Sequence, residues 1–167
     1  MPSAGRLRRA TARLAEAQRA KAGYSGTPLP QKLGIRPGHR VALEQPPSGF
    51  EATLGSLPDG VQILSAGRGR DFDVMLLFVR SLATLEAKLA PAIARMAPAT
   101  ALWICWPKKT SPLASDVDEN KVRERGLDAG IVDIKVCAVD SDWSGLKFVF
   151  RLKDRPALEK EKARKKK

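Results

Sequence analysis

Six segments of the chain carry apolar residues at the spacing of β-strands, and helical patterns or loops separate them. The segments are HRVALEQ, VQILS, FDVMLLFV, TALWICW, IVDIKVCAV and LKFVFRL. FDVMLLFV is apolar almost throughout, which predicts a strand buried on both faces. Strands of this kind that alternate with helices predict a three-layer α/β fold, with an open, mostly parallel sheet between two layers of helices.

Three helices are predicted between these strands, each from a capping residue followed by apolar or helix-forming residues. Ser48 should cap the first helix, and residues 81–97 form the second and longest. Asp116 or Asp118 should cap the third, DENKVRER, and Gly126 should end it. The turn DSDWSG makes the last two strands antiparallel neighbours, so a C-terminal antiparallel hairpin closes the sheet.

The net charge of +12 is concentrated at the two ends of the chain. Residues 1–22 carry +5 and residues 151–167 carry +6, whereas residues 23–150 carry only +1. We therefore predict a basic N-terminal arm over 1–22 that is flexible or conditionally helical, one α/β domain over 23–153, and a lysine-rich disordered tail over 154–167. The arms suit a nucleic acid or another polyanion, but solubilising tails would look the same.

Several classes of site and location are disfavoured by composition. No apolar run is long enough to span a bilayer, and the Arg-rich N-terminus lacks the apolar centre of a secretory signal, although an organellar transit peptide stays open. Cys105 and Cys137 lie in apolar runs and should be reduced, buried thiols. With His39 as the single histidine, a metal site is not expected. The sequence predicts a cytoplasmic protein with no cofactor and leaves its oligomeric state open.

The order of elements resembles the nucleoside-methyltransferase type of Rossmann-like fold over roughly residues 35–152, with FDVMLLFV in the place of its fourth strand. The motifs YSGTPLPQKLGI, WPKKTS and DSDWSGLKFVFR carry a closer resemblance over residues 24 to about 153. They are similar to the bacterial domain-of-unknown-function family 3052. This resemblance implies a small bacterial α/β protein and transfers no catalytic residue, and topology alone licenses no activity.

No complete catalytic motif is present. A methyltransferase needs a glycine-rich turn after its first strand, and this chain has EQPPSGF there, where Pro46 and Pro47 remove two amide donors. AGRGRD lacks the spacing of a phosphate-binding loop. Cys105 lies in mid-strand far from His39, and Asp140 and Asp142 are typical turn residues. We therefore predict no catalytic residue.

Basic residues follow the predicted ends of three strands and point to an anion site. The carboxyl ends of parallel strands share one edge of an open α/β sheet, which is where such sheets bind ligands. The ligand would be a nucleotide, a phosphorylated metabolite or a nucleic-acid backbone. Pairing of the same cations with nearby aspartates in solvated loops is the alternative. The predicted site residues are Arg68 and Arg70, then Arg80, and then Lys108, Lys109 and Thr110.

Three functions fit these observations. The first is a non-catalytic or degenerate Rossmann-like binding protein for an anionic ligand, which the loss of the glycine turn favours. The second is a divergent methyltransferase-like transferase. The third is an interaction adaptor that uses its basic arms, with Trp143 either covering the core or forming a contact surface.

Overall fold

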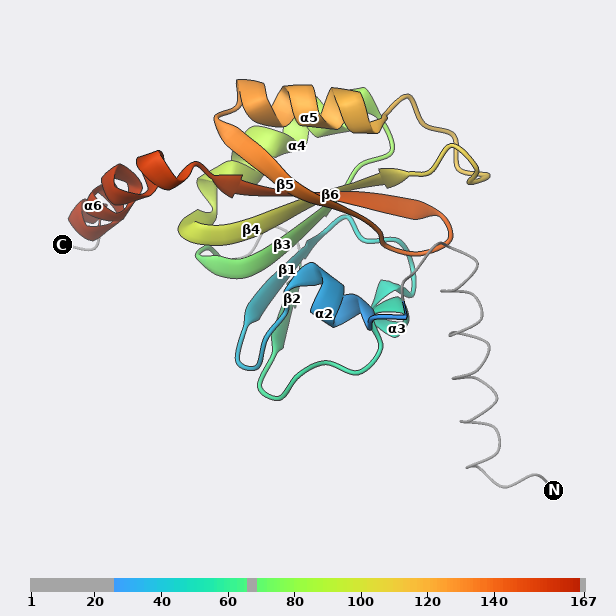
Figure 1. The fold of residues 1–167 in the computed structure, drawn as a ribbon, viewed down its shortest axis with the longest axis horizontal. Helices are drawn as coiled ribbons and strands as arrows, with labels where there is room; N and C mark the ends of the chain where they lie inside the picture. The colour runs from blue at the N-terminus through green and yellow to red at the C-terminus, as the bar shows by residue number, and fades with distance from the viewer. Residues whose placement is uncertain (1–25, 66–68, 166–167) are drawn as a thin grey trace.

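A six-stranded sheet with the order β2-β1-β3-β4-β6-β5 forms the centre of the computed structural model, which describes residues 26–65 and 69–165 (Figure 1). β1 to β4 are parallel, and β6 is antiparallel to both β4 and β5. This confirms the mostly parallel sheet with an antiparallel C-terminal hairpin. The strands are β1 Arg40–Glu44, β2 Gln62–Ser65, β3 Phe72–Phe78, β4 Met96–Pro107, β5 Ile131–Ala138 and β6 Trp143–Phe150.

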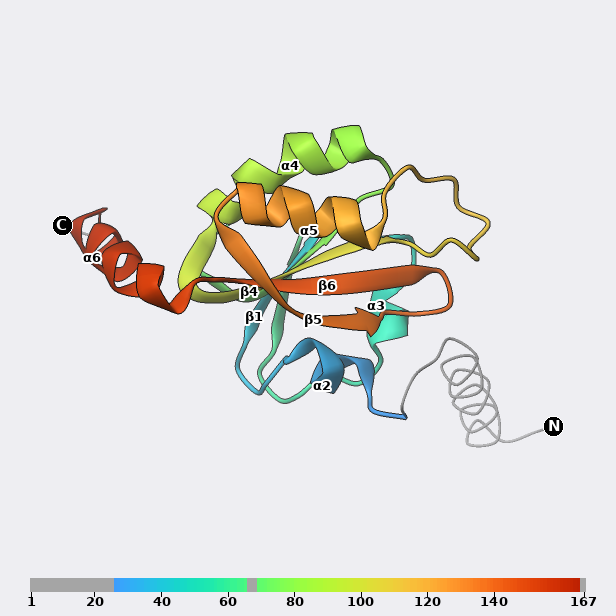
Figure 2. The ribbon, with the colours of Figure 1, turned by 45° about the horizontal axis from the view of Figure 1, so that its top comes forward.

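Helices cover both faces of the sheet, as the three-layer prediction requires (Figures 1 and 2). One face carries α2 (Leu29–Leu33) and α3 (Phe50–Leu54), and the other carries α4 (Leu82–Ala94) and α5 (Glu119–Asp128). Each face has its own cluster of buried apolar residues. None of the described helices is both long and apolar enough to cross a membrane.

The central strand β3 separates the two cores. Met75 and Leu77 pack in the cluster under α4 and α5, whereas Val74, Leu76 and Phe78 pack in the cluster under α2 and α3. The strand pairs with β1 on one side and β4 on the other. This confirms the prediction that FDVMLLFV is buried on both faces.

The third predicted helix is longer than expected. Asp118 caps α5, and its side chain accepts a hydrogen bond from Lys121 N at 2.9 Å. Gly126 lies inside the helix, so the prediction that it ends the helix was wrong. A β-carbon added there would lie less than 3.0 Å from three atoms of the buried Phe148 ring. Gly126 is therefore explained by the close approach of α5 to β6.

One further local prediction was wrong, because Gly49, not Ser48, is the N-cap of α3, and it adopts the left-handed conformation with φ 77°. The C-terminal tail, for which disorder or at best a loose helix was expected, contains helix α6 (Arg155–Lys165), which follows a short 3₁₀ turn at Leu152–Asp154. Alanine, leucine, glutamate and lysine dominate this segment, and all four are strong helix formers. The predicted N-terminal arm lies outside the described residues.

Candidate functional site

A pocket of about 500 Å³ opens where the connections on the two sides of the sheet diverge. β1 and β3 are parallel neighbours, but the chain leaves β1 for α3 on one face and β3 for α4 on the other. In open α/β sheets this switch in connection is the usual place for a ligand. We call this cavity the switch pocket. Its lining residues are Gln45, Pro46, Pro47, Ser48, Phe78, Arg80, Thr84, Leu113 and Trp143.

The loop from β1 to α3 forms a stiff wall of the pocket. Gln45 has φ 53°, which is uncommon for a residue with a side chain and costs about 1–3 kcal/mol. Pro46 and Pro47 follow it, fix their own φ angles and carry no N–H group. The wall therefore contributes shape and apolar surface, and at these two positions it has no amide to donate to a ligand.

The aromatic floor of the pocket comes from Phe78 and Trp143. Their rings meet edge to face, with centroids 5.2 Å apart, and Phe50 packs against Phe78 at 4.7 Å. Trp143 N donates to Asp140 Oδ1 at 2.8 Å, so Asp140 is the turn residue that was expected. Trp143 is only 5% exposed. Of the two alternatives for Trp143, the structure therefore favours the first, because the indole covers the core beside Phe78.

Arg80 is the single charged side chain among the described residues that line the switch pocket. It follows β3, is exposed, and forms no hydrogen bond or ion pair with the described part of the chain. Next to it, Ser81 caps α4 by accepting from Thr84 N at 3.1 Å. Ser81 Oγ also donates to Thr84 Oγ1 at 2.8 Å, so the hydrogen of the Thr84 hydroxyl can point to a ligand.

Lys108 and Lys109 line a neighbouring pocket of about 400 Å³ beside the start of α5, together with Asp118 and Glu119. Burial lowers the pKa of Lys108, and the nearby carboxylates of Asp140 and Asp142 act in the opposite direction. Exposed Thr110 does not line the switch pocket. The structure thus gives these lysines acidic neighbours.

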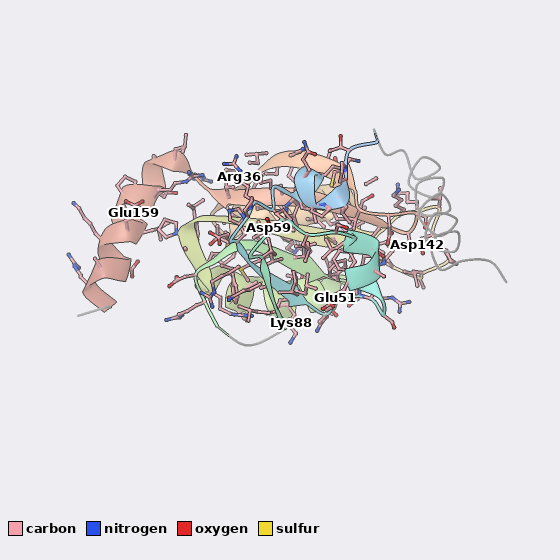
Figure 3. All side chains as sticks on the ribbon, turned by 90° about the horizontal axis from the view of Figure 1, so that it is seen from below. Arg36, Glu51, Asp59, Lys88, Asp142 and Glu159 are labelled. Carbon is pink, nitrogen blue, oxygen red and sulfur yellow. The ribbon has the colours of Figure 1, made fainter. Side chains whose placement is uncertain are left out.

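Arg70 lies at the opposite edge of the sheet. Its carbonyl oxygen accepts from Arg40 Nη1 at 3.1 Å where β1 begins, and Asp71 N donates to Arg95 O just before β4. Arg68 falls outside the described residues. The expectation that Arg70 shares one edge of the sheet with Arg80, Lys108 and Lys109 is therefore wrong, because Arg70 lies beside the start of β1. Figure 3 shows the carboxyl-terminal edge at the end marked by Glu51 and Asp142, away from Glu159 of α6.

Glu44, at the end of β1, does not face the switch pocket. Its carboxylate is buried and pairs with the Arg95 guanidinium, which also donates to Gly69 O at 3.0 Å and lies 5.2 Å from the Phe72 ring centroid. The partner Arg95 is 51 positions away in the sequence, so the fold and not the local chain brings the two charges together. Through Arg95, this ion pair links Glu44 of β1 to Gly69, which precedes β3.

The remaining candidate residues are structural. Cys105 is fully buried, and burial raises the pKa of its thiol well above the ordinary value. Cys137 is also a free thiol, but it is half-buried rather than buried as predicted. His39 lies just before β1, where its Nδ1 accepts from Arg36 N at 3.1 Å. Within the described residues no cluster of histidine, cysteine and acidic side chains could hold a metal ion.

Sequence reasoning missed most of the switch pocket. Gln45, Ser48, Thr84 and Leu113 come from three different connections, and only the fold brings them together. The one available signal was EQPPS, which follows the first strand at the place where α/β folds bind ligands.

No family model and no curated protein match the sequence. Among solved structures, TrmN from Thermus thermophilus is 14% identical with a TM-score of 0.48, and the similarity covers 74% of this chain and 47% of TrmN, about half its length. A putative methyltransferase from Thermoplasma acidophilum is 9% identical with a TM-score of 0.48, and the similarity covers 71% of this chain and 70% of that protein. The protein in the DhpI–SAH complex is 13% identical with a TM-score of 0.49, and the similarity covers 83% of each chain. Similarities this weak assign no activity or ligand to the chain.

Proposed function

We propose that this protein is a non-catalytic, Rossmann-like binding protein whose switch pocket holds a nucleotide-sized ligand with one ring system and one acidic group. The observation that carries the proposal is Arg80, the only charged side chain among the described lining residues of a pocket of about 500 Å³. Ligand sites are usually mainly apolar cavities of about 300–1,000 Å³ with a few placed polar groups. The switch pocket fits this description.

Each part of such a ligand has a matching wall. The guanidinium of Arg80 can donate two parallel hydrogen bonds to a phosphate or carboxylate. Pro46, Pro47 and Leu113 offer apolar surface to a ring, and Ser48 and Thr84 offer hydroxyl groups to a sugar or another polar group. A nucleoside monophosphate has all three parts, so we take it as the representative ligand.

The lining also supports binding without catalysis. The described residues around the switch pocket include no carboxylate, histidine or cysteine that could act as a base or nucleophile. Methyl transfer would not require such a residue, but it would require S-adenosylmethionine. Pro46 and Pro47 stand where a glycine-rich turn would approach that cofactor, so we expect no tight binding of it.

Isothermal titration calorimetry on the full chain tests the proposal with adenosine monophosphate and S-adenosylmethionine as separate ligands. We expect the monophosphate to bind and Arg80→Gln to weaken its binding about tenfold or more, because a charge-assisted hydrogen bond is worth about 1.5–3 kcal/mol. Arg70→Gln removes an equal charge at the opposite edge and should change nothing. Equal weakening by both variants would contradict the site. Micromolar binding of S-adenosylmethionine alone would favour the methyltransferase-like alternative.

A further inference from the structure

A second pocket, of about 550 Å³, lies between α2 and the outermost strand β5. We call it the α2–β5 groove. Its described lining residues include two lysines but no aspartate or glutamate. The lining residues are Thr27, Gln31, Lys32, Lys135, Val136, Cys137, Ala138 and Ser144.

Three elements bring cations together at this groove. Lys32 comes from α2 and Lys135 from β5, and Lys147 is the register partner of Lys135 on β6. Residues directly opposite each other on neighbouring strands share a face, and like charges in this position repel. Lys147 Nζ lies 6.0 Å from the Trp103 ring centroid, and Trp103 Nε1 donates to Leu33 O of α2 at 3.0 Å. The Lys147 ammonium group is thus held on the side of the sheet that α2 covers.

Like charges lie close together at the groove. The pKa of Lys147 is lowered first by burial and then by the charges of Lys135 and Arg36. The pKa of Lys32 is lowered first by burial and to a smaller extent by Lys135, while Cys137 acts in the opposite direction. In the described part of the chain, Lys135, Lys147 and Arg36 enter none of the ion pairs. The folded protein therefore carries a cost of like-charge repulsion that a bound anion would remove.

We propose that the α2–β5 groove binds an oligophosphate group, with Lys32 and Lys135 in contact with it and Lys147 and Arg36 supplying further positive charge. Several adjacent lysines suit a group with several negative charges, and lysine binds phosphate as a point charge. Thr27 and Gln31 add side chains able to form hydrogen bonds.

The same phosphate chemistry could come from a small molecule or from a nucleic-acid backbone, and the lining favours the small molecule. Sequence-tolerant binding of single strands relies on aromatic side chains that stack on bases. None of the described lining residues of the groove is aromatic. This site is separate from the switch pocket, because the two linings share no residue. Either proposal can fail alone.

Calorimetry of the full chain with sodium tripolyphosphate, at constant ionic strength, tests the groove. The variant is Lys32→Gln/Lys135→Gln. Its charge-matched control is Lys88→Gln/Lys153→Gln, which removes two exposed lysines from α4 and the 3₁₀ turn. We expect the groove variant to lose about tenfold or more in tripolyphosphate affinity and the control to keep it. Equal affinities of the two variants would overturn the proposal.

Two further measurements keep the test decisive. Without ligand, Lys135→Gln alone should unfold at a higher temperature than the wild type, because it removes a charge that repels Lys147. A lower unfolding temperature would count against the charge cluster. In the wild type, tripolyphosphate should slow reductive methylation of Lys32, Lys135 and Lys147 but not of Lys88. Should a single-stranded RNA oligonucleotide protect these lysines while tripolyphosphate does not, the small-molecule assignment would be wrong.

Discussion

Replacing Gly126 by alanine should destabilise the protein, although alanine is the better helix former. In a helix interior the exchange normally stabilises by about 1 kcal/mol. Here the added β-carbon would lie less than 3.0 Å from three ring atoms of Phe148, which is fully buried. Overpacking of this kind costs about 1–3 kcal/mol, and the upper part of that range applies because the three distances are far below ordinary van der Waals contact. We expect a net loss of about 1–2 kcal/mol in the free energy of unfolding.

Urea denaturation followed by circular dichroism measures this loss, and Phe148→Leu provides the matched background. In that background the ring is gone, so Gly126→Ala should become neutral or stabilising. Stabilisation of the wild-type background by Gly126→Ala would refute the packing argument. An equal cost in both backgrounds would refute it too, because the cost would then come from the backbone conformation rather than from the ring.

Three further predictions concern other parts of the chain. Glu44→Gln should lower the free energy of unfolding by about 1.5–3 kcal/mol in urea denaturation, because it removes the negative charge that pairs with Arg95 while the hydrogen bond from Arg95 to Gly69 O remains; a cost below about 0.5 kcal/mol would contradict this. Burial raises the pKa of Cys137 while Lys32 and Lys135 lower it, so iodoacetamide should alkylate Cys137 more slowly than a free peptide thiol. Lys32→Gln should slow the alkylation further, because it removes a charge that favours the thiolate, and faster alkylation in the variant would contradict this. In a gel-shift assay the full chain should bind RNA with an affinity that falls steeply with salt, and a fragment of residues 23–153 should not bind. Equal affinity of the full chain and the fragment would show that the basic arms do not carry the binding.

The parts of the fold that the sequence could predict depend on local signals. The apolar run of β3 specified burial on both faces, and the turn DSDWSG specified the β5–β6 hairpin. Asp118 could be named as one of two candidate helix caps, because a capping side chain accepts a hydrogen bond from the amide three residues later. Each of these features is decided by residues close together in the chain.

The errors arose where distant residues decide the outcome. Arg70 could not be placed from its position after β2, because its contact with Arg40, at the start of β1, is formed by a residue far away in the sequence. Gly126 was read as a helix end because its contact, Phe148, is on another element. Lys32, Lys135 and Lys147 come from three elements, so no sequence window contained the cluster.

The three tryptophans allow one direct test of the central claim, that the switch pocket is the ligand site. Trp143 lines the switch pocket, Trp106 lines the pocket beside α5, and Trp103 lies in the core beneath α2. Fluorine NMR of the full chain labelled with fluorotryptophan, titrated with adenosine monophosphate, reports on each place separately once single Trp→Phe variants assign the signals. We predict that the Trp143 resonance shifts with saturation while the other two stay in place. A shift of Trp106 alone would place the ligand at Lys108 and Lys109 and contradict the account.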